Sequence, residues 1–192
     1  MGAAAGPAPP PGAVELLERA VAYTRESLLE VTEADLTRAT PCSEWSLADL
    51  LQHMDDALVV MAEAAQGSSL ALVPDPAPAL PELLESICRR ACGLLELWHP
   101  PRAGQVALGD LSLTRELVGC VGALEITLHG WDVATALGRP RAIPPDLAMD
   151  LWPVARDHIV AADRHAAFGP ALEVPDWASP QERLLAHSGR RD

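Results

Sequence analysis

The chain has 192 residues, 49% of them apolar and 21% charged, and a formal net charge of -13 at pH 7. This length suits one domain with a substantial core. The acidic balance argues against a broad surface for DNA, RNA or an anionic membrane, because such a surface needs clustered basic side chains, and the 14 arginines form no such cluster.

Residues 1–12 contain only Met, Gly, Ala and Pro. They offer no periodic apolar face and predict a disordered tail ahead of a single domain at 13–192. The tail lacks the basic start and continuous apolar segment of a signal peptide, and the chain has no uninterrupted run of about 18 apolar residues. We therefore expect a cytoplasmic protein. Its cysteines are expected to be free and buried, since disulfide scaffolds belong to exported proteins; they are Cys42, Cys88, Cys92 and Cys120.

Apolar residues recur at spacings of three and four along five segments, which predicts five helices. The helices are expected at 13–34, from 47 to a Pro-rich crossover loop at 66–80, at 81–98, at 112–137 and at 143–162. We also expect a brief extended piece at 106–108, a kink at Pro153 and a last helical turn at 181–187. These elements predict an all-α fold, a four-helix bundle with one long crossover loop and a C-terminal helical extension.

The second helix has a well-specified start. Ser46 and Asp49 have the spacing of a capping box, and Trp45 can pack onto Leu50 across it. The helix is therefore expected to begin at Leu47.

The segment LEITLHGWD at 124–132 places an acid and an imidazole, Glu125 and His129, one turn apart on the fourth predicted helix. A buried carboxylate without a partner costs several kcal/mol. A hydrogen-bonded pair, or an arginine such as Arg115 or Arg156, would remove that cost, and so would a divalent metal bound by both side chains. The predicted inward face of this helix comprises Leu117, Val121, Leu124, Glu125, Leu128, His129 and Asp132.

His53 is the single histidine of the second helix and lies on its apolar face. Spacing alone favours an ordinary buried pair at 125 and 129, because a lone histidine on an apolar face is usually structural. The sequence does not show whether His53 faces that pair.

Three segments carry a resemblance to a known family: TPCSEWSLADLLQHMDDAL at 40–58, ALEITLHGWDVATALGRP at 123–140 and FGPALEVPDWASPQERLLAHSGR at 168–190. Together they resemble the actinobacterial metal-binding proteins of the DinB-like superfamily, in the branch related to the N-terminal domain of mycothiol-dependent maleylpyruvate isomerase. The resemblance implies that His53, Glu125 and His129 are metal ligands. Three ligands leave a coordination position for water, a thiolate or a substrate oxygen. Zinc is expected first, although Ni, Mn and Fe(II) also suit these ligands.

Residues one turn from the histidines are candidates for a supporting role. Asp132 has the spacing to accept a hydrogen bond from the ring N–H of His129 that does not face the metal. Asp49 or Asp56 has the spacing to do the same for His53. The ordinary alternative for Asp132 is a solvated acid near a helix end. Trp45 and Trp131 are expected to pack.

Cys42 precedes a helix N-terminus, where a thiolate is favoured, so it is a candidate nucleophile. No histidine partner for it can be identified from the sequence. Burial is therefore the default interpretation of this residue.

The resemblance implies a metal-dependent enzyme that activates mycothiol or a similar thiol for transfer to, or isomerisation of, a small-molecule substrate. Maleylpyruvate itself is not expected, because the isomerase has a further C-terminal domain for which this chain lacks the length. The alternatives are a thiol-independent hydrolase, lyase or cyclase of natural-product biosynthesis, and a non-catalytic metal- or ligand-binding protein. Neither nucleic acid nor a membrane is an expected partner, and a homodimer stays open.

Overall fold

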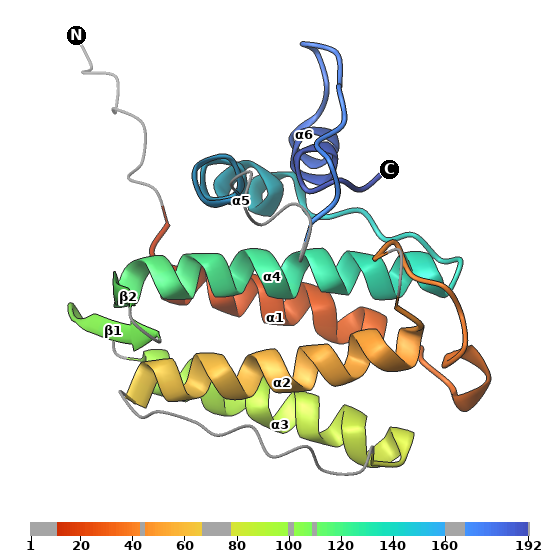
Figure 1. The fold of residues 1–192 in the computed structure, drawn as a ribbon, viewed down its shortest axis with the longest axis horizontal. Helices are drawn as coiled ribbons and strands as arrows, with labels where there is room; N and C mark the ends of the chain where they lie inside the picture. The colour runs from red at the N-terminus through yellow and green to blue at the C-terminus, as the bar shows by residue number, and fades with distance from the viewer. Residues whose placement is uncertain are drawn as a thin grey trace, which may run out of the picture.

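Four long helices form the body of the computed structural model, which describes residues 11–42, 45–66, 78–99, 102–108, 111–159 and 168–191. They are α1 (Ala13–Leu28), α2 (Leu47–Gln66), α3 (Leu80–Trp98) and α4 (Arg115–Ala136), and they run side by side (Figure 1). Helices α5 (Pro145–His158) and α6 (Pro180–His187) lie over the α4 side of this bundle. The predicted all-α class, with a C-terminal helical extension, is confirmed. The expected disordered tail, up to residue 10, and residues 67–77 of the crossover loop lie outside the described residues.

The closest packing in the bundle joins α1 to α4. A Cβ atom on Gly130 would lie 2.3 Å from Thr24 Oγ1 and 3.0 Å from Thr24 Cα, so only glycine allows this approach of the two helices. The buried Thr24 hydroxyl donates to the Ile126 carbonyl oxygen over 2.7 Å. The contact fixes the α4 turn that carries the acid and imidazole of LEITLHGWD.

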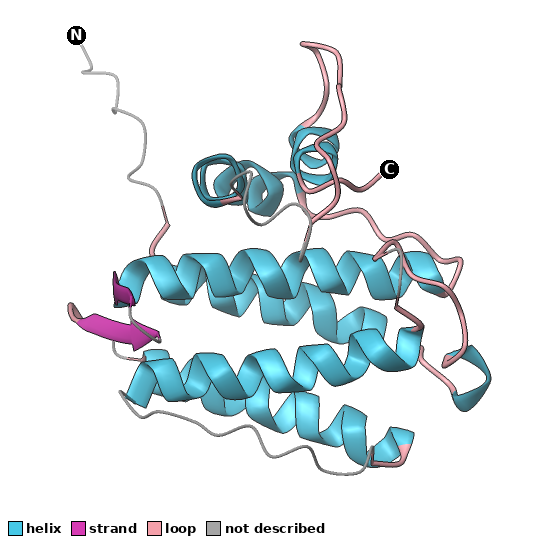
Figure 2. Cartoon of the chain, in the orientation of Figure 1, coloured by secondary structure: helices cyan, strands magenta, loops and turns pink. Residues whose placement is uncertain are grey.

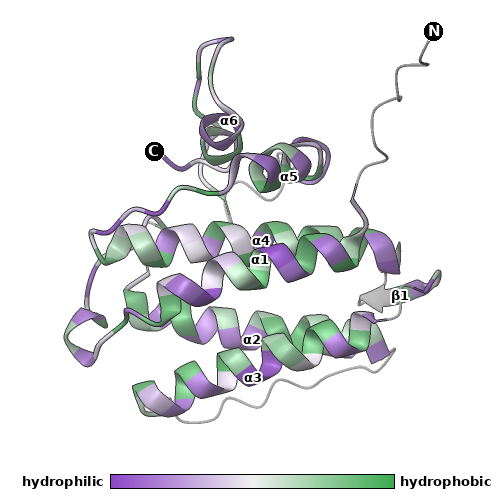
Figure 3. Ribbon diagram, turned by 180° about the vertical axis from the view of Figure 1, so that it is seen from behind, coloured by the Kyte–Doolittle hydropathy of each residue, from purple (hydrophilic) through white to green (hydrophobic). Residues whose placement is uncertain are grey.

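Helix α4 is the most apolar helix of the bundle. An 18-residue window within it has a mean hydropathy of 1.2, so by length and composition alone it could cross a membrane. However, 72% of that window is buried inside the protein, as in the central helix of a bundle. In Figure 3, apolar residues (green) and polar residues (purple) alternate along each helix of the bundle.

The structure corrects two predicted helix boundaries. The first helix ends at Leu28 and not at residue 34, because the chain turns there and forms a short 3-10 helix at Glu33–Asp35. The fourth helix begins at Arg115 and not at Ser112, because strand β2 (Leu111–Thr114) pairs antiparallel with β1 (Gln105–Leu108). Both strands are magenta in Figure 2. The predicted extended piece was thus one half of a hairpin.

Two further predictions about helix faces and ends differ from the structure. Val121 was expected to face inward but is 37% exposed, because the buried face of α4 near it is formed by small residues, including Gly119 and Gly122. Helix α5 contains Pro153 and ends at His158, before the predicted 162; residues 160–167 are outside the described part, and the kink stays a prediction.

The capping box predicted at the start of α2 is confirmed. Asp49 Oδ2 accepts hydrogen bonds from the Ser46 backbone N–H over 2.9 Å and from its hydroxyl over 2.5 Å. The Leu47 backbone N–H also donates to the Arg38 carbonyl oxygen over 2.8 Å. These contacts tie the segment before α2 to the helix start, and so place Cys42 and Trp45 beside α4.

Candidate metal centre

Helices α2 and α4 bring His53, Glu125 and His129 together in the interior of the bundle. Glu125 Oε1 lies 3.3 Å from His53 Nε2 and 3.0 Å from His129 Nε2. The three ligand atoms are all within 4.8 Å of one another. The i, i+4 spacing places the two α4 side chains on one face, and the packing of α2 against α4 supplies the third.

This geometry fits a divalent metal. Two ligands at about 2.0–2.1 Å from a tetrahedral zinc ion are separated by about 3.3 Å, close to the spacings around Glu125 Oε1. The side chain of His129 is 6% exposed, that of Glu125 26% and that of His53 34%. The three residues therefore hold the ligand atoms in a site that is buried at His129 and accessible from the side of His53.

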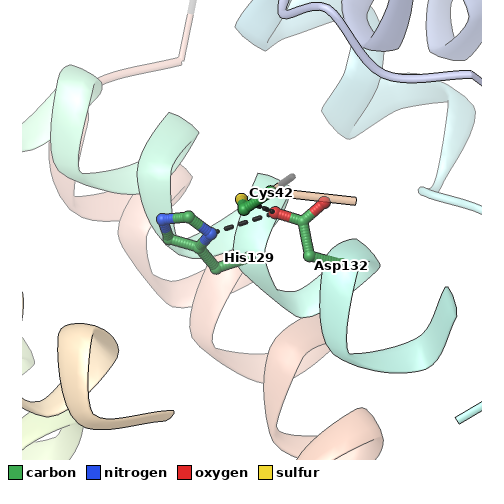
Figure 4. Close-up of side chains that lie close together, drawn as sticks. All are labelled: Cys42, His129 and Asp132. Carbon is green, nitrogen blue, oxygen red and sulfur yellow. Dashed lines mark hydrogen bonds and ion pairs between the residues drawn. The ribbon is translucent and has the colours of Figure 1, made fainter. Parts of the chain in front are cut away.

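The other nitrogen of His129 faces a second acid. Asp132 is 0% exposed, and its Oδ2 lies 3.0 Å from His129 Nδ1. Figure 4 shows this contact, with Cys42 beside it. The alternative of a solvated Asp132 is therefore wrong, because the end of α4 is covered by the C-terminal segment.

Arg190 supplies the counterion of Asp132. Its Nε donates to Asp132 Oδ1 over 2.8 Å, and its second terminal nitrogen donates to Oδ2 over 2.7 Å. Such a bidentate ion pair fixes the orientation of the two side chains relative to each other. The Arg190 side chain is 4% exposed, so this cation is a built-in part of the interior.

The end of α6 directs Arg190 to this position. Gly189 has φ +81°, a left-handed conformation that favours glycine, and its N–H donates to the Ala186 carbonyl oxygen over 3.1 Å. The Arg190 N–H donates to the Leu185 carbonyl oxygen over 2.8 Å. This pair of bonds is a Schellman motif, which reverses the chain after a helix. The sequence LAHSGR therefore encodes the turn that returns Arg190 to α4.

The acids and the imidazole shift one another's protonation. Burial raises the pKa of Asp132, but Arg190 outweighs it and the net shift is downward. Burial likewise raises the pKa of Glu125, yet the charge of His129 and hydrogen bonds from both imidazoles lower it overall. Burial lowers the pKa of His129, whereas Glu125 and Asp132 raise it well above its ordinary value. Both acids are thus held ionised.

The ionised Asp132 accepts a hydrogen bond, so His129 Nδ1 carries a proton. His129 Nε2 then needs either a second proton or a metal ion between itself and the Glu125 carboxylate, because two lone pairs 3.0 Å apart repel. The space between His129 Nε2 and the Glu125 carboxylate therefore holds either a proton or a metal ion.

Cys42 and Trp45 border the centre. Cys42 Sγ lies 3.5 Å from Asp132 Oδ2 and 3.7 Å from the Arg190 guanidinium, so this half-buried thiol does have charged neighbours that the sequence did not indicate. The Trp45 ring centroid is 4.6 Å from that of His53 and 6.3 Å from that of His129. Trp45 therefore packs against the candidate ligands and not merely in the core.

The remaining candidates have other partners. Asp49 is engaged in the capping box, and Asp56 accepts from the Gln52 side-chain amide over 3.1 Å. Arg115 donates to the carbonyl oxygens of Ala65 and Leu97, and Arg156 pairs with Asp157. Trp131 is buried in the core as expected. Of the cysteines, all free, Cys92 is exposed and not buried, and the other three are intermediate.

Sequence reasoning missed Arg190. It lies 58 residues from Asp132, and no spacing rule connects a residue after α6 to one on α4. The available signal was indirect: an inward acid on a helix needs a cation, and one arginine directly follows a Ser-Gly helix stop.

Comparisons with known proteins match the part of the chain that forms α1 to α4. The family model described as the mycothiol maleylpyruvate isomerase N-terminal domain matches residues 17–134. Two uncharacterized proteins from two strains of Mycobacterium tuberculosis are each 29% identical to this chain over 171 residues, covering 85% of it and 90% of the relative. No solved structure matches significantly. The family match spans both ligand-bearing helices and ends before α5, so it does not include Arg190.

Proposed function

Because the chain belongs to the mycothiol maleylpyruvate isomerase N-terminal domain family, we propose that it is a divalent-metal-dependent enzyme acting on a small molecule. His53, Glu125 and His129 would hold the ion. One observation carries the proposal: three ligand atoms lie within 4.8 Å of one another around an ionised acid whose partners in the described part of the chain are two imidazoles and no arginine.

Each residue of the site has a defined task in this proposal. A bound divalent ion would supply a Lewis acid that favours the deprotonated form of a thiol or water and polarises a substrate oxygen. Asp132 fixes the tautomer and orientation of His129 through Nδ1. Trp45 packs against the His53 ring and helps to hold its orientation. The ligand types suit zinc first, and Ni, Mn or Fe(II) next.

We propose mycothiol, or a similar low-molecular-weight thiol, as the co-substrate. The family name supports it, and three protein ligands leave a position where a thiolate can bind. The competing candidates are a thiol-independent hydrolase, lyase or cyclase using water at the same position, and a protein that binds the ion or a ligand without turnover.

Elemental analysis of the purified, zinc-loaded protein tests the metal proposal. We expect about one ion per chain in the wild type, and none in His53→Ala, whose helical content should be unchanged because this side chain is one-third exposed. His99→Ala is the matched control, since His99 is an exposed histidine paired with Glu18. An ion-free wild type, or His53→Ala that retains the ion, would refute the site and support the ordinary buried pair.

Cobalt-substituted protein tests whether a thiol binds to the metal ion. Titration with mycothiol should produce a sulfur-to-cobalt charge-transfer band in the wild type. His53→Ala should show no band. A cobalt-loaded wild type without the band supports the thiol-independent candidates.

A further inference from the structure

A cavity of about 80 Å³ lies between α1, α2, α3 and α4, next to the candidate metal centre. Glu125 and His129 form part of its wall on α4. Arg25 on α1 and Cys92 on α3 also line it, and both are exposed at the surface. The cavity therefore connects the solvent beside α1 and α3 with two of the three candidate ligands.

The cavity wall is almost entirely apolar. Aliphatic and thioether side chains from the first three helices make up most of it; they include Val21, Leu28, Met54, Leu58, Met61 and Ile87. The hydroxyl of Thr24, which also lines it, already donates to the Ile126 carbonyl oxygen. Among the described lining residues Arg25 is the single arginine, and it stands at the open end, whereas the other basic residue, His129, stands at the metal centre.

Such a wall discriminates strongly by polarity. A carboxylate or hydroxyl placed among these side chains would lose its water without gaining partners, at a cost of several kcal/mol. A hydrocarbon group placed there gains affinity with each methylene removed from water. A small dicarboxylate can therefore satisfy one anionic end at the metal centre, but its other end has no partner inside.

We propose that the substrate of this site is an amphiphile: a metal-binding oxygen or sulfur head group at Glu125 and His129, followed by an apolar, unbranched chain that fills the cavity toward Arg25. This inference rests on the proposed function and names its substrate class. A cavity of about 150 Å³ is known to accept benzene, so about 80 Å³ has too little room for a ring and suits a few carbon atoms of an alkyl or acyl chain.

Straight-chain hydroxamic acids of increasing length test the proposal, because they combine a metal-binding head with an alkyl tail. Binding to the zinc-loaded protein is measured by isothermal titration calorimetry. We expect affinity to rise about two- to fourfold for each added methylene until the chain reaches the surface, and then to level off. Succinic monohydroxamic acid, with a carboxylate at the tail end, should bind no better than acetohydroxamic acid.

A cavity-filling variant identifies where the tail lies. Ala57 on α2 lines the cavity and is half-buried. Ala57→Leu should leave the affinity for acetohydroxamic acid unchanged and remove most of the gain with chain length. Ala22→Leu, on the exposed face of α1, is the matched control and should preserve the full gain.

Thiol protection in the unmutated protein gives a second readout that does not depend on the variant folding. Octanohydroxamic acid should slow alkylation of Cys92, on the cavity wall, at least tenfold more than acetohydroxamic acid does. Cys120, which is outside the cavity lining, is the internal reference and should show no such difference.

The outcomes separate this inference from the proposed function. If the protein holds zinc and binds acetohydroxamic acid but shows neither chain-length dependence nor protection of Cys92, the amphiphile is wrong and the metal centre stands. If the protein holds no zinc, both proposals fail together.

Discussion

His129 separates two regions that look alike in geometry and differ in charge. At Nδ1, Cys42 and Asp132 complete one group of possible ligand atoms, and at Nε2, His53 and Glu125 complete the other; each group lies within 4.8 Å. The first group contains the carboxylate already paired with Arg190. Among the described residues, the acid of the second group pairs with imidazoles and with no arginine. Geometry alone therefore does not identify a metal site. The second group is the better candidate, because an imidazole can give up its proton to a metal ion and an arginine cannot.

Removing the built-in cation should have the largest effect. Arg190→Met leaves the buried Asp132 carboxylate without its arginine and with the hydrogen bond from His129 as its remaining strong contact, and we expect the free energy of unfolding of the metal-free protein to fall by about 3–5 kcal/mol. Urea denaturation in the presence of a chelator measures it.

The opposite region provides the control for that experiment. Glu125→Gln removes an acid whose partners are two imidazoles, which can lose a proton when the acid is gone, whereas Asp132 keeps its charge when Arg190 is removed. The free energy of unfolding of the metal-free protein should therefore fall by only about 1 kcal/mol. Equal losses in the two variants would show that the two regions are not different in charge balance.

Asp132→Asn should weaken zinc binding by about 10- to 100-fold while all three ligands stay in place, because the orientation of His129 is then less well fixed. Competition with a chromophoric chelator gives the affinity. Asp56→Asn is the matched control, since Asp56 bonds to Gln52, and it should bind zinc as the wild type does. An unchanged affinity in Asp132→Asn would remove Asp132 from the metal centre.

Trp45→Leu removes the ring that packs against His53, and it should weaken zinc binding less than Asp132→Asn does. The ring contact stabilises the His53 orientation by about 1 kcal/mol, so zinc affinity should fall by about two- to tenfold. Trp177→Leu, at an 82% exposed tryptophan, should leave the affinity unchanged. If both variants behave alike, the contact with His53 has no role in metal binding.

Cys42→Ser should change zinc stoichiometry and affinity least, by less than about twofold. Arg190 repels a cation from the region of Cys42 and Asp132, so the thiol is not expected to be a ligand. A tenfold or larger loss of affinity would place the ion on the Nδ1 side and contradict the charge argument.

Local patterns in the sequence predicted the parts of the molecule that local rules govern. The capping box of Ser46 and Asp49 set the start of α2, and the four-residue spacing placed Glu125 and His129 on one face. The first helix was predicted too long because Val31 continues the apolar spacing; the side chain is indeed buried, but it enters the core from the turn after the helix.

Contacts between distant segments were not available from spacing. The sequence placed His53 on an apolar face, and only the packing of α2 on α4 shows that this face meets Glu125. The pairing of Asp132 with Arg190 depends on a helix stop in the C-terminal extension. The hairpin at 105–114 consists of two strands of four residues each, which are too short to give a clear alternating pattern.

The position of Arg190 near the end of the chain also affects when the bundle becomes stable during protein synthesis. All three candidate ligands and Asp132 leave the ribosome before Arg190 is added, so a nascent chain that has already formed α1 to α4 still lacks both the segment that covers Asp132 and the arginine that pairs with it. We therefore expect the nascent bundle to become fully stable only after the Schellman turn at Gly189 has closed.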